Sequence, residues 1–147
     1  MAKFVFGLET LLQHRDRIEQ KERDELLRRI YNHQIELQNR DRLTVQLKET
    51  MEEMSRKQAE DISSQELNWF YLYINRLRLE IQESEKRLLQ IDSGVQEQKK
   101  NVVEASKKKK TLVSLRAKQE KAFTFALDKQ EQKEIDELVV TRYVGKV

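Results

Sequence analysis

The apolar residues in the second half of the chain recur at alternating steps of three and four. Only two positions of this repeat up to Ala105, Ser84 and Gln98, are polar. A sustained seven-residue repeat predicts a long helix with a narrow apolar seam, and such a seam needs a partner helix. From Leu67 to Leu112 the spacing selects Leu67, Phe70, Ile74, Leu77, Ile81, Ser84, Leu88, Ile91, Val95, Gln98, Val102, Ala105, Lys109 and Leu112.

The start of this helix carries its own signal. Ser63 lies three residues before Glu66, the spacing of a capping box, in which the serine hydroxyl accepts a hydrogen bond from a free backbone amide. Ile62 and Leu67 flank the box at the two positions of a hydrophobic staple. The helix is therefore predicted to begin at Ser63 or Ser64.

The first half of the chain carries a weaker seam, in two phases. The first phase is held by Leu8, Leu11, Arg15 and Ile18. A shift of one residue changes the winding of a coiled coil without ending the helix. After such a shift the second phase runs through Leu26, Ile30, His33, Leu37, Arg40, Thr44, Leu47, Met51 and Met54.

These patterns predict an all-α fold in which two long helices form an antiparallel coiled-coil hairpin, a single domain over residues 1–147. The first helix is expected at about 8–60, the turn at about 61–63 and the second helix at about 64–142. A turn near Asp61 would place Met54 near Leu67. Because the second helix is longer, roughly its last 25 to 30 residues should form an unpaired C-terminal arm. Gly94 is expected to be a tolerated helix glycine, with a functional bend as the alternative.

Composition supports long helices and excludes several kinds of chemistry. The chain has no Pro, no Cys and 3 Gly, so it lacks nearly all turn punctuation as well as disulfides and thiolate metal sites. Charged residues make up 37% of the chain, but the net charge is only +3, which implies no strong global attraction to nucleic acid or anionic lipid.

Catalytic and membrane-spanning signals are missing from the sequence. His14 and His33 are its two histidines, and neither belongs to a helix-spaced pair of metal ligands. There is no Gly-rich phosphate loop, so we expect no enzyme activity, no cofactor and no metal. No apolar run approaches the ~20 residues of a membrane span, and the N-terminus lacks the order of a signal peptide. The chain is expected to remain in the compartment where it is made.

Three surfaces are candidates for binding. Just after the turn, Phe70 should point inward while its neighbours form an outward apolar stripe. This stripe is either a docking surface or local packing over the turn, and its candidate residues are Trp69, Tyr71, Leu72 and Tyr73.

Lys107 to Lys110 form a basic run, interpreted as a solvated face or as partners of Asp16, Glu19 and Glu22 across the hairpin. An acidic protein partner and nucleic acid are the alternatives, although no stacking aromatics interleave with the lysines. On the C-terminal arm, Ile135, Leu138 and Val139 form a small apolar face. This face favours binding to another protein over the alternative, a charged helix end that frays.

Several of these residues resemble a known family, the FliJ family of flagellar export proteins. The resemblance spans essentially the whole chain: the opening Phe4, Phe6, Leu8, Leu11, Leu12 and Arg15; the aromatic segment leading to Leu77 and Ile81; and, most specifically, Glu131-Gln132-Lys133 with Asp136-Glu137. It implies a cytoplasmic component of type III protein export in a flagellated bacterium, held at the inner face of the cell membrane through its partners.

The resemblance also implies a non-catalytic stalk that inserts into the export ATPase hexamer, promotes its activity or assembly, contacts the cytoplasmic domain of the membrane export gate and escorts export chaperones. The candidate residues for binding the ATPase hexamer are then Glu131, Gln132, Lys133, Asp136 and Glu137. The candidates for binding the export gate are Trp69, Tyr71, Leu72 and Tyr73. The alternatives are the stalk of a non-flagellar type III secretion system, a generic coiled-coil tether or scaffold, and nucleic-acid binding through Lys107 to Lys110.

Overall fold

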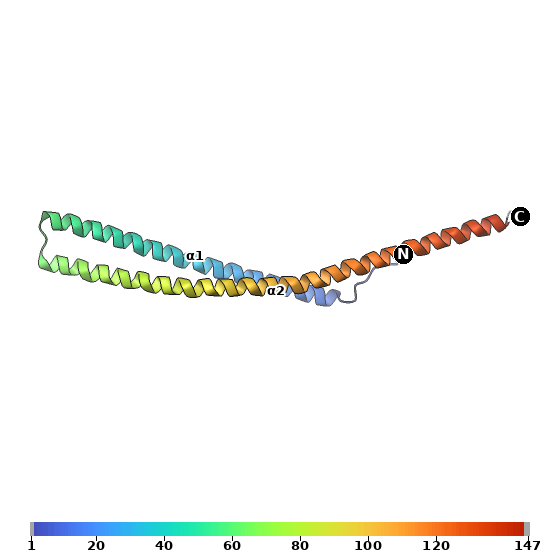
Figure 1. Ribbon diagram of the computed structural model, residues 1–147, viewed down its shortest axis with the longest axis horizontal. Helices are drawn as coiled ribbons and strands as arrows, with labels where there is room; N and C mark the ends of the chain where they lie inside the picture. The colour runs from blue at the N-terminus through green and yellow to red at the C-terminus, as the bar shows by residue number, and fades with distance from the viewer. Residues whose placement is uncertain (1, 146–147) are drawn as a thin grey trace. The chain divides into compact units, whose positions relative to one another are not determined.

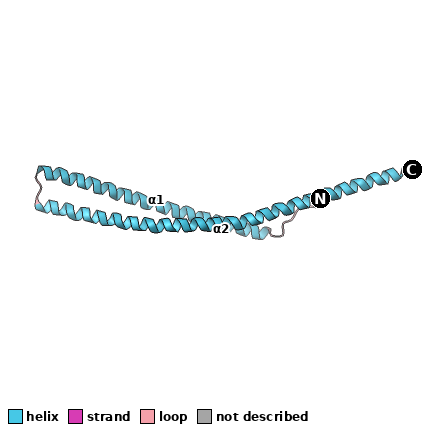
Figure 2. Ribbon diagram, in the orientation of Figure 1, coloured by secondary structure: helices cyan, strands magenta, loops and turns pink. Residues whose placement is uncertain are grey.

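The structure is a computed structural model that describes residues 2–145, and it contains two helices. Helix α1 spans Glu9–Glu60 and helix α2 spans Ser64–Gly145, joined by residues 61–63 (Figure 1). No strand occurs in residues 2–145 (Figure 2). The predicted all-α helical hairpin is therefore confirmed. The chain divides into two compact units: unit 1 comprises Met1–Lys21 and Val103–Val147, and unit 2 comprises Glu22–Val102.

Unit 2 is an antiparallel helix pair closed by the 61–63 connection (Figure 1). The predicted seam of α2 is buried or half-buried here, and Leu43 of α1 is buried as well. An apolar seam of this kind removes side chains from water along the whole length of the pair, which is the main stabilising contribution in a coiled coil. The buried apolar residues that α2 contributes to unit 2 are Phe70, Ile74, Leu77, Leu88 and Val95.

The chain reversal is built from one unusual residue and one cap. Asp61 has a φ of 143°, a region that residues with a side chain rarely adopt, and its amide donates to the Lys57 carbonyl at 3.2 Å. The Ser63 hydroxyl then accepts a hydrogen bond from the Glu66 amide at 3.2 Å. Its carbonyl accepts one from the Leu67 amide at 3.0 Å. Ser63 is thus the N-cap of α2, as the sequence predicts.

The predicted seam of α1 is partly wrong. Leu8 and Leu11 are exposed while Leu12 is buried, and Leu43 is buried where Thr44 was expected. There is no phase shift: the residues of one uninterrupted seven-residue repeat are buried or half-buried along the whole of α1. Many of its members are charged, and their long aliphatic stems fill the seam while their polar ends bond across it or reach water. This repeat is Leu12, Arg15, Glu19, Glu22, Leu26, Arg29, His33, Glu36, Arg40, Leu43, Leu47, Thr50, Met54 and Lys57.

Unit 1 has a small apolar core at the start of α1. Phe6, Leu12 and Leu112 are buried together, with Phe4 and Leu115 packed against them. The ring centroid of Phe4 lies 5.8 Å from that of Phe123. The segment before α1 therefore packs against α2 beyond the point that α1 itself reaches. After Leu127 every described side chain is exposed. We call residues 128–145 the arm; it is shorter than expected because the N-terminal phenylalanines reach beyond the first turn of α1.

Candidate functional site

The first polar layer of unit 2 joins Ser84 to Glu36. Ser84 has 0% of its surface exposed, and its hydroxyl donates to Oε1 of Glu36 at 2.7 Å. Nε of Arg87 donates to the same oxygen at 3.0 Å. The Ser84 hydrogen bond, and after it the hydrogen bond and charge of Arg87, lower the pKa of the Glu36 carboxyl. The polar seam position is therefore satisfied from the opposite helix.

A second layer lies two heptads away. Gln98, 2% exposed, donates through Nε2 to the Glu22 carbonyl at 2.9 Å and to the Glu22 carboxylate. Its Oε1 accepts from Asn101 at 3.1 Å. Sequence reasoning did not place either carboxylate in the seam, although a signal was present: Glu22 and Glu36 have the same spacing as Ser84 and Gln98. Equal spacing on antiparallel helices indicates facing pairs.

Between these layers Arg29 bridges the two helices. Its Nη1 donates to the Gly94 carbonyl at 2.8 Å, and its Nε donates to Glu25 at 3.0 Å. Hydrogen bonds from Arg28 and Arg29 lower the pKa of Glu25 to about 2. Gly94 itself lies inside α2, so the helix continues through it, as expected.

The residues after the turn form a partly packed aromatic surface. Trp69 is 56% exposed, Tyr71 and Leu72 are also exposed, and Tyr73 is half-buried. The Trp69 and Tyr73 rings stack at 5.3 Å with an interplanar angle of 6°. Phe70 is buried, as predicted, with Nζ of Lys57 5.7 Å from its ring centroid. The structure thus brings Trp69 and Tyr73 together and leaves Tyr71 and Leu72 on the surface.

The candidate ring-binding residues lie in the arm and are all exposed: Glu131, Gln132, Lys133, Asp136 and Glu137. Only one hydrogen bond between side chains links them in the described part of the chain, from Nε2 of Gln132 to Oδ1 of Asp136 at 3.2 Å. The apolar side chains of the arm are exposed as well, namely Ile135, Leu138, Val139, Val140, Tyr143 and Val144.

The basic run divides into a paired residue and exposed ones. Nζ of Lys109 lies 2.7 Å from Oδ1 of Asp16 and 3.8 Å from Oε2 of Glu19, so the predicted pairing across the helices is confirmed for this lysine. Glu22, offered as a third partner, bonds to Gln98 instead. The other three lysines of the run, Lys107, Lys108 and Lys110, are exposed.

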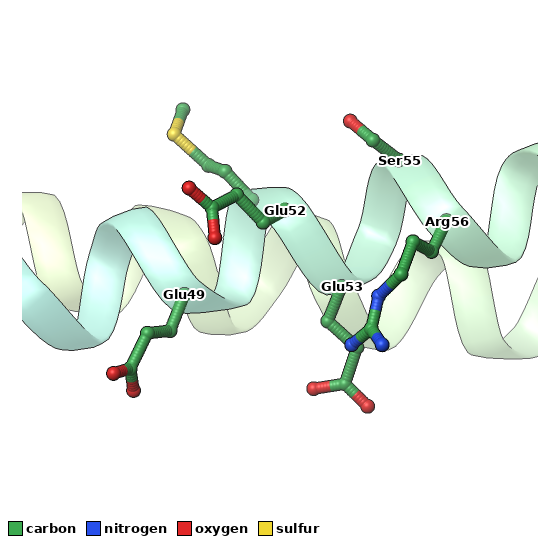
Figure 3. A pocket seen from close by; sticks show the side chains of 6 residues that line it. Glu49, Glu52, Glu53, Ser55 and Arg56 are labelled. Atoms are coloured by element: carbon green, nitrogen blue, oxygen red, sulfur yellow. The ribbon is translucent and has the colours of Figure 1, made fainter.

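Two surface hollows lie on unit 2, one on α1 alone and one between α1 and α2. One is lined by residues of α1 alone, whose side chains radiate from a single helix with no opposite wall (Figure 3). His33 lines a shallow groove with Leu37, Leu88 and Asp92, and His14 is exposed. Among residues 2–145 no three His, Cys, Asp or Glu side chains gather into a possible metal site. No helix in the same stretch is long and apolar enough to cross a bilayer.

Fold and surface together define a class of protein: a helical hairpin whose seam contains hydrogen-bonded polar side chains and whose surface exposes aromatic and apolar side chains. The family model for the flagellar FliJ protein matches residues 4–147, so the chain belongs to the FliJ family and is a component of flagellar protein export. No curated protein sequence and no solved structure matches the chain.

Proposed function

We propose that this protein is a non-catalytic stalk that inserts its arm into the hexameric export ATPase and links that ATPase to the membrane export gate. The observation that carries the proposal is the arm itself. Residues 128–145 are helical, yet every described side chain among them is exposed. Helices in proteins gain most of their stability from packing of one face against a neighbour rather than from intrinsic propensity. A partner that covers the arm supplies that packing.

The chemistry of the arm suits a protein channel. Over about 27 Å of helix it presents carboxylates and lysines on several sides, with valines, Leu138 and Tyr143 between them. A single asymmetric helix touches six equivalent subunits unequally. Unequal contacts favour different conformations in different subunits, because a ligand shifts an equilibrium only through its differential affinity for the states. This is how a stalk without catalytic residues can promote the activity or assembly of its ATPase.

The aromatic surface after the turn is the proposed contact for the cytoplasmic domain of the gate. Trp69, Tyr71 and Leu72 expose apolar area, and Trp69 is held by its stack on Tyr73. A pre-ordered tryptophan loses little conformational freedom on binding, and Trp and Tyr are enriched at the centres of protein interfaces. Escort of export chaperones, and a peripheral position at the inner face of the cell membrane through these partners, belong to the same proposal.

The ring contact is tested with the purified chain and the export ATPase of the same organism. We expect the wild-type chain to promote ring formation and to raise the rate of ATP hydrolysis. The variant Glu131→Ala/Asp136→Ala/Glu137→Ala should lose most of both effects. The matched control, Glu49→Ala/Glu52→Ala/Glu53→Ala, removes three exposed carboxylates from α1 and should retain them. If the wild-type chain changes neither quantity, the stalk function is wrong.

The direction of the stalk is tested by the double variant Trp69→Ala/Tyr73→Ala. It should bind the gate domain at least tenfold more weakly, a change of about 1.4 kcal/mol, and leave ATPase stimulation intact. The control Leu27→Ala/Tyr31→Ala removes exposed apolar area from α1 and should not alter gate binding. Intact gate binding together with weakened ATPase binding would show that the two surfaces are assigned the wrong way round.

A further inference from the structure

Four lysines of unit 1 lie on one exposed face of α2. Lys107 and Lys118 are eleven residues apart, as are Lys110 and Lys121, and eleven residues make about three helical turns. All four are exposed, while Ala105 and Leu112 on the other side of the helix are buried. We call these four residues the lysine face. It covers about 21 Å of helix.

The charge of the lysine face is not neutralised within the described chain. The acidic residues at the start of α1 pair with other cations: Asp16 with Lys109, and Glu9 with Arg116, whose Nε is 3.7 Å away. Glu104 and Glu120 are the only carboxylates of α2 between 103 and 121. Across residues 2–145, neither forms an ion pair with a residue of the lysine face. Four positive charges therefore remain directed at solvent.

An exposed apolar residue lies at each end of the lysine face. Val103 precedes Lys121 by eighteen residues, and Phe125 follows Lys107 by eighteen. Eighteen residues make five full turns, so both apolar side chains lie on the same side of the helix as the lysines. Val103 is 51% and Phe125 is 70% exposed. The face is thus a row of point charges with an aromatic residue at one end.

We propose that the lysine face is a peripheral membrane-binding surface that takes an anionic phospholipid bilayer, with Phe125 entering the headgroup region. Flexible ammonium groups suit a fluid layer of phosphates, because they need no fixed geometry of the kind that an arginine fork demands. A straight helical row matches a flat surface, and lysines beside an exposed Phe are the composition of interfacial helices. Single-stranded nucleic acid would be favoured by aromatics between the cations, whereas Phe125 lies beyond them. This binding is independent of the ATPase contact proposed above.

The test is sedimentation of the full chain with vesicles of phosphatidylcholine alone or mixed with phosphatidylglycerol. We expect binding to the anionic vesicles only, weakening steeply as salt is raised, because exposed charges are screened over about 10 Å at 0.1 M salt. The variant Lys107→Gln/Lys110→Gln/Lys118→Gln/Lys121→Gln should bind at least tenfold more weakly, since each lysine near such a surface contributes several-fold. Phe125→Ala should weaken binding by a smaller factor and leave the salt dependence unchanged.

A matched variant removes the same charge elsewhere and should bind anionic vesicles as the wild type does; it replaces the exposed residues Lys3, Lys21, Lys48 and Lys86 by Gln. Circular dichroism checks that both variants keep their helicity. Equal loss in the two variants would mean that net charge alone drives binding, which overturns the lysine face. No binding of the wild-type chain to anionic vesicles, or equal binding to neutral ones, overturns the proposal. Tighter binding at the same salt to polyglutamate or to a DNA oligonucleotide would show that the partner class is wrong.

Discussion

At the scale of single residues, Gly94 carries a cost that the structure does not require. Glycine inside a helix is about 1 kcal/mol less favourable than alanine. A Cβ at this position would lie 3.6 Å from Nη1 of Arg29, an ordinary van der Waals distance, and the hydrogen bond from Arg29 goes to the Gly94 carbonyl. The backbone bond is therefore compatible with a side chain.

Gly94→Ala should raise the stability of the chain by about 1 kcal/mol, or roughly 2–4 °C in Tm for a chain of this size. The measurement is thermal unfolding followed by circular dichroism. Arg29→Met, which removes the bridge but keeps an aliphatic stem, is the comparison and should lower Tm. A lower Tm for Gly94→Ala would mean that Arg29 needs the space the glycine leaves.

The Glu36 carboxyl should make stability depend on acid. Its pKa is lowered below 4.5 in the folded chain by the Ser84 hydroxyl and by Arg87, so the folded state favours the ionised form. The stability that results is fully present above the unfolded pKa and is lost as pH falls from about 4.5 through the lowered value. Urea unfolding from pH 7 to pH 3 should show this loss. Glu36→Gln should show a smaller loss over the same range; an unchanged profile would exclude Glu36 as its source.

At single positions, the seven-residue repeat predicts which polar residues of α2 are buried, but it does not predict which carboxylates of α1 are partly buried. Ser84 and Gln98 were placed on the seam because they fit the repeat, and they are among its most buried members. Glu22 and Glu36 were not placed there, because a hydropathy pattern treats a carboxylate as solvent-facing. They are partly buried because each meets a donor on the opposite helix. Such pairs depend on both helices at once, which a pattern read along one segment does not contain.

At the scale of elements, α2 is predictable and α1 is only partly so. The seam of α2 is mostly apolar, so the spacing of its apolar residues shows directly which positions belong to the seam. The α1 seam includes Arg29, Glu36 and Arg40. Leu8, just before the helix, and Leu11, in its first turn, suggested a phase that the helix does not follow. The N-terminal segment added a further element, because Phe4 and Phe6 pack without a helical repeat. Packing by an irregular segment leaves no period to detect.

The start of α2 should depend on one hydroxyl. The Ser63 hydroxyl accepts a hydrogen bond from the Glu66 amide, whereas the side chain of the adjacent Ser64 forms no hydrogen bond within residues 2–145. Ser63→Ala should therefore destabilise the hairpin by about 1 kcal/mol. Ser64→Ala, the neighbouring control, should change stability by less than about 0.5 kcal/mol, as is usual for surface positions. Chemical denaturation of both variants measures the difference, and equal values would contradict the assignment of Ser63 as the cap.

At the scale of the whole molecule, burial differs sharply along the chain. The seam of unit 2 is covered throughout, while residues 128–145 have no cover at all. Membership of the FliJ family places the chain in flagellar protein export. The sequence predicted an unpaired arm because α2 is longer than α1. Its partner residues stay a prediction, because exposed helix positions look alike until something covers them.

This contrast predicts the pattern of amide hydrogen exchange in the free protein. Amides exchange when a helix opens locally, and an unpacked helix opens at far lower cost than one held by a buried seam. Residues 128–145 should therefore exchange orders of magnitude faster than residues 70–105. Adding the export ATPase should slow exchange in the arm, and the Glu131→Ala/Asp136→Ala/Glu137→Ala variant should show much less slowing. Strong protection of the arm in the free chain would instead point to self-association, which a dilution series and light scattering would reveal.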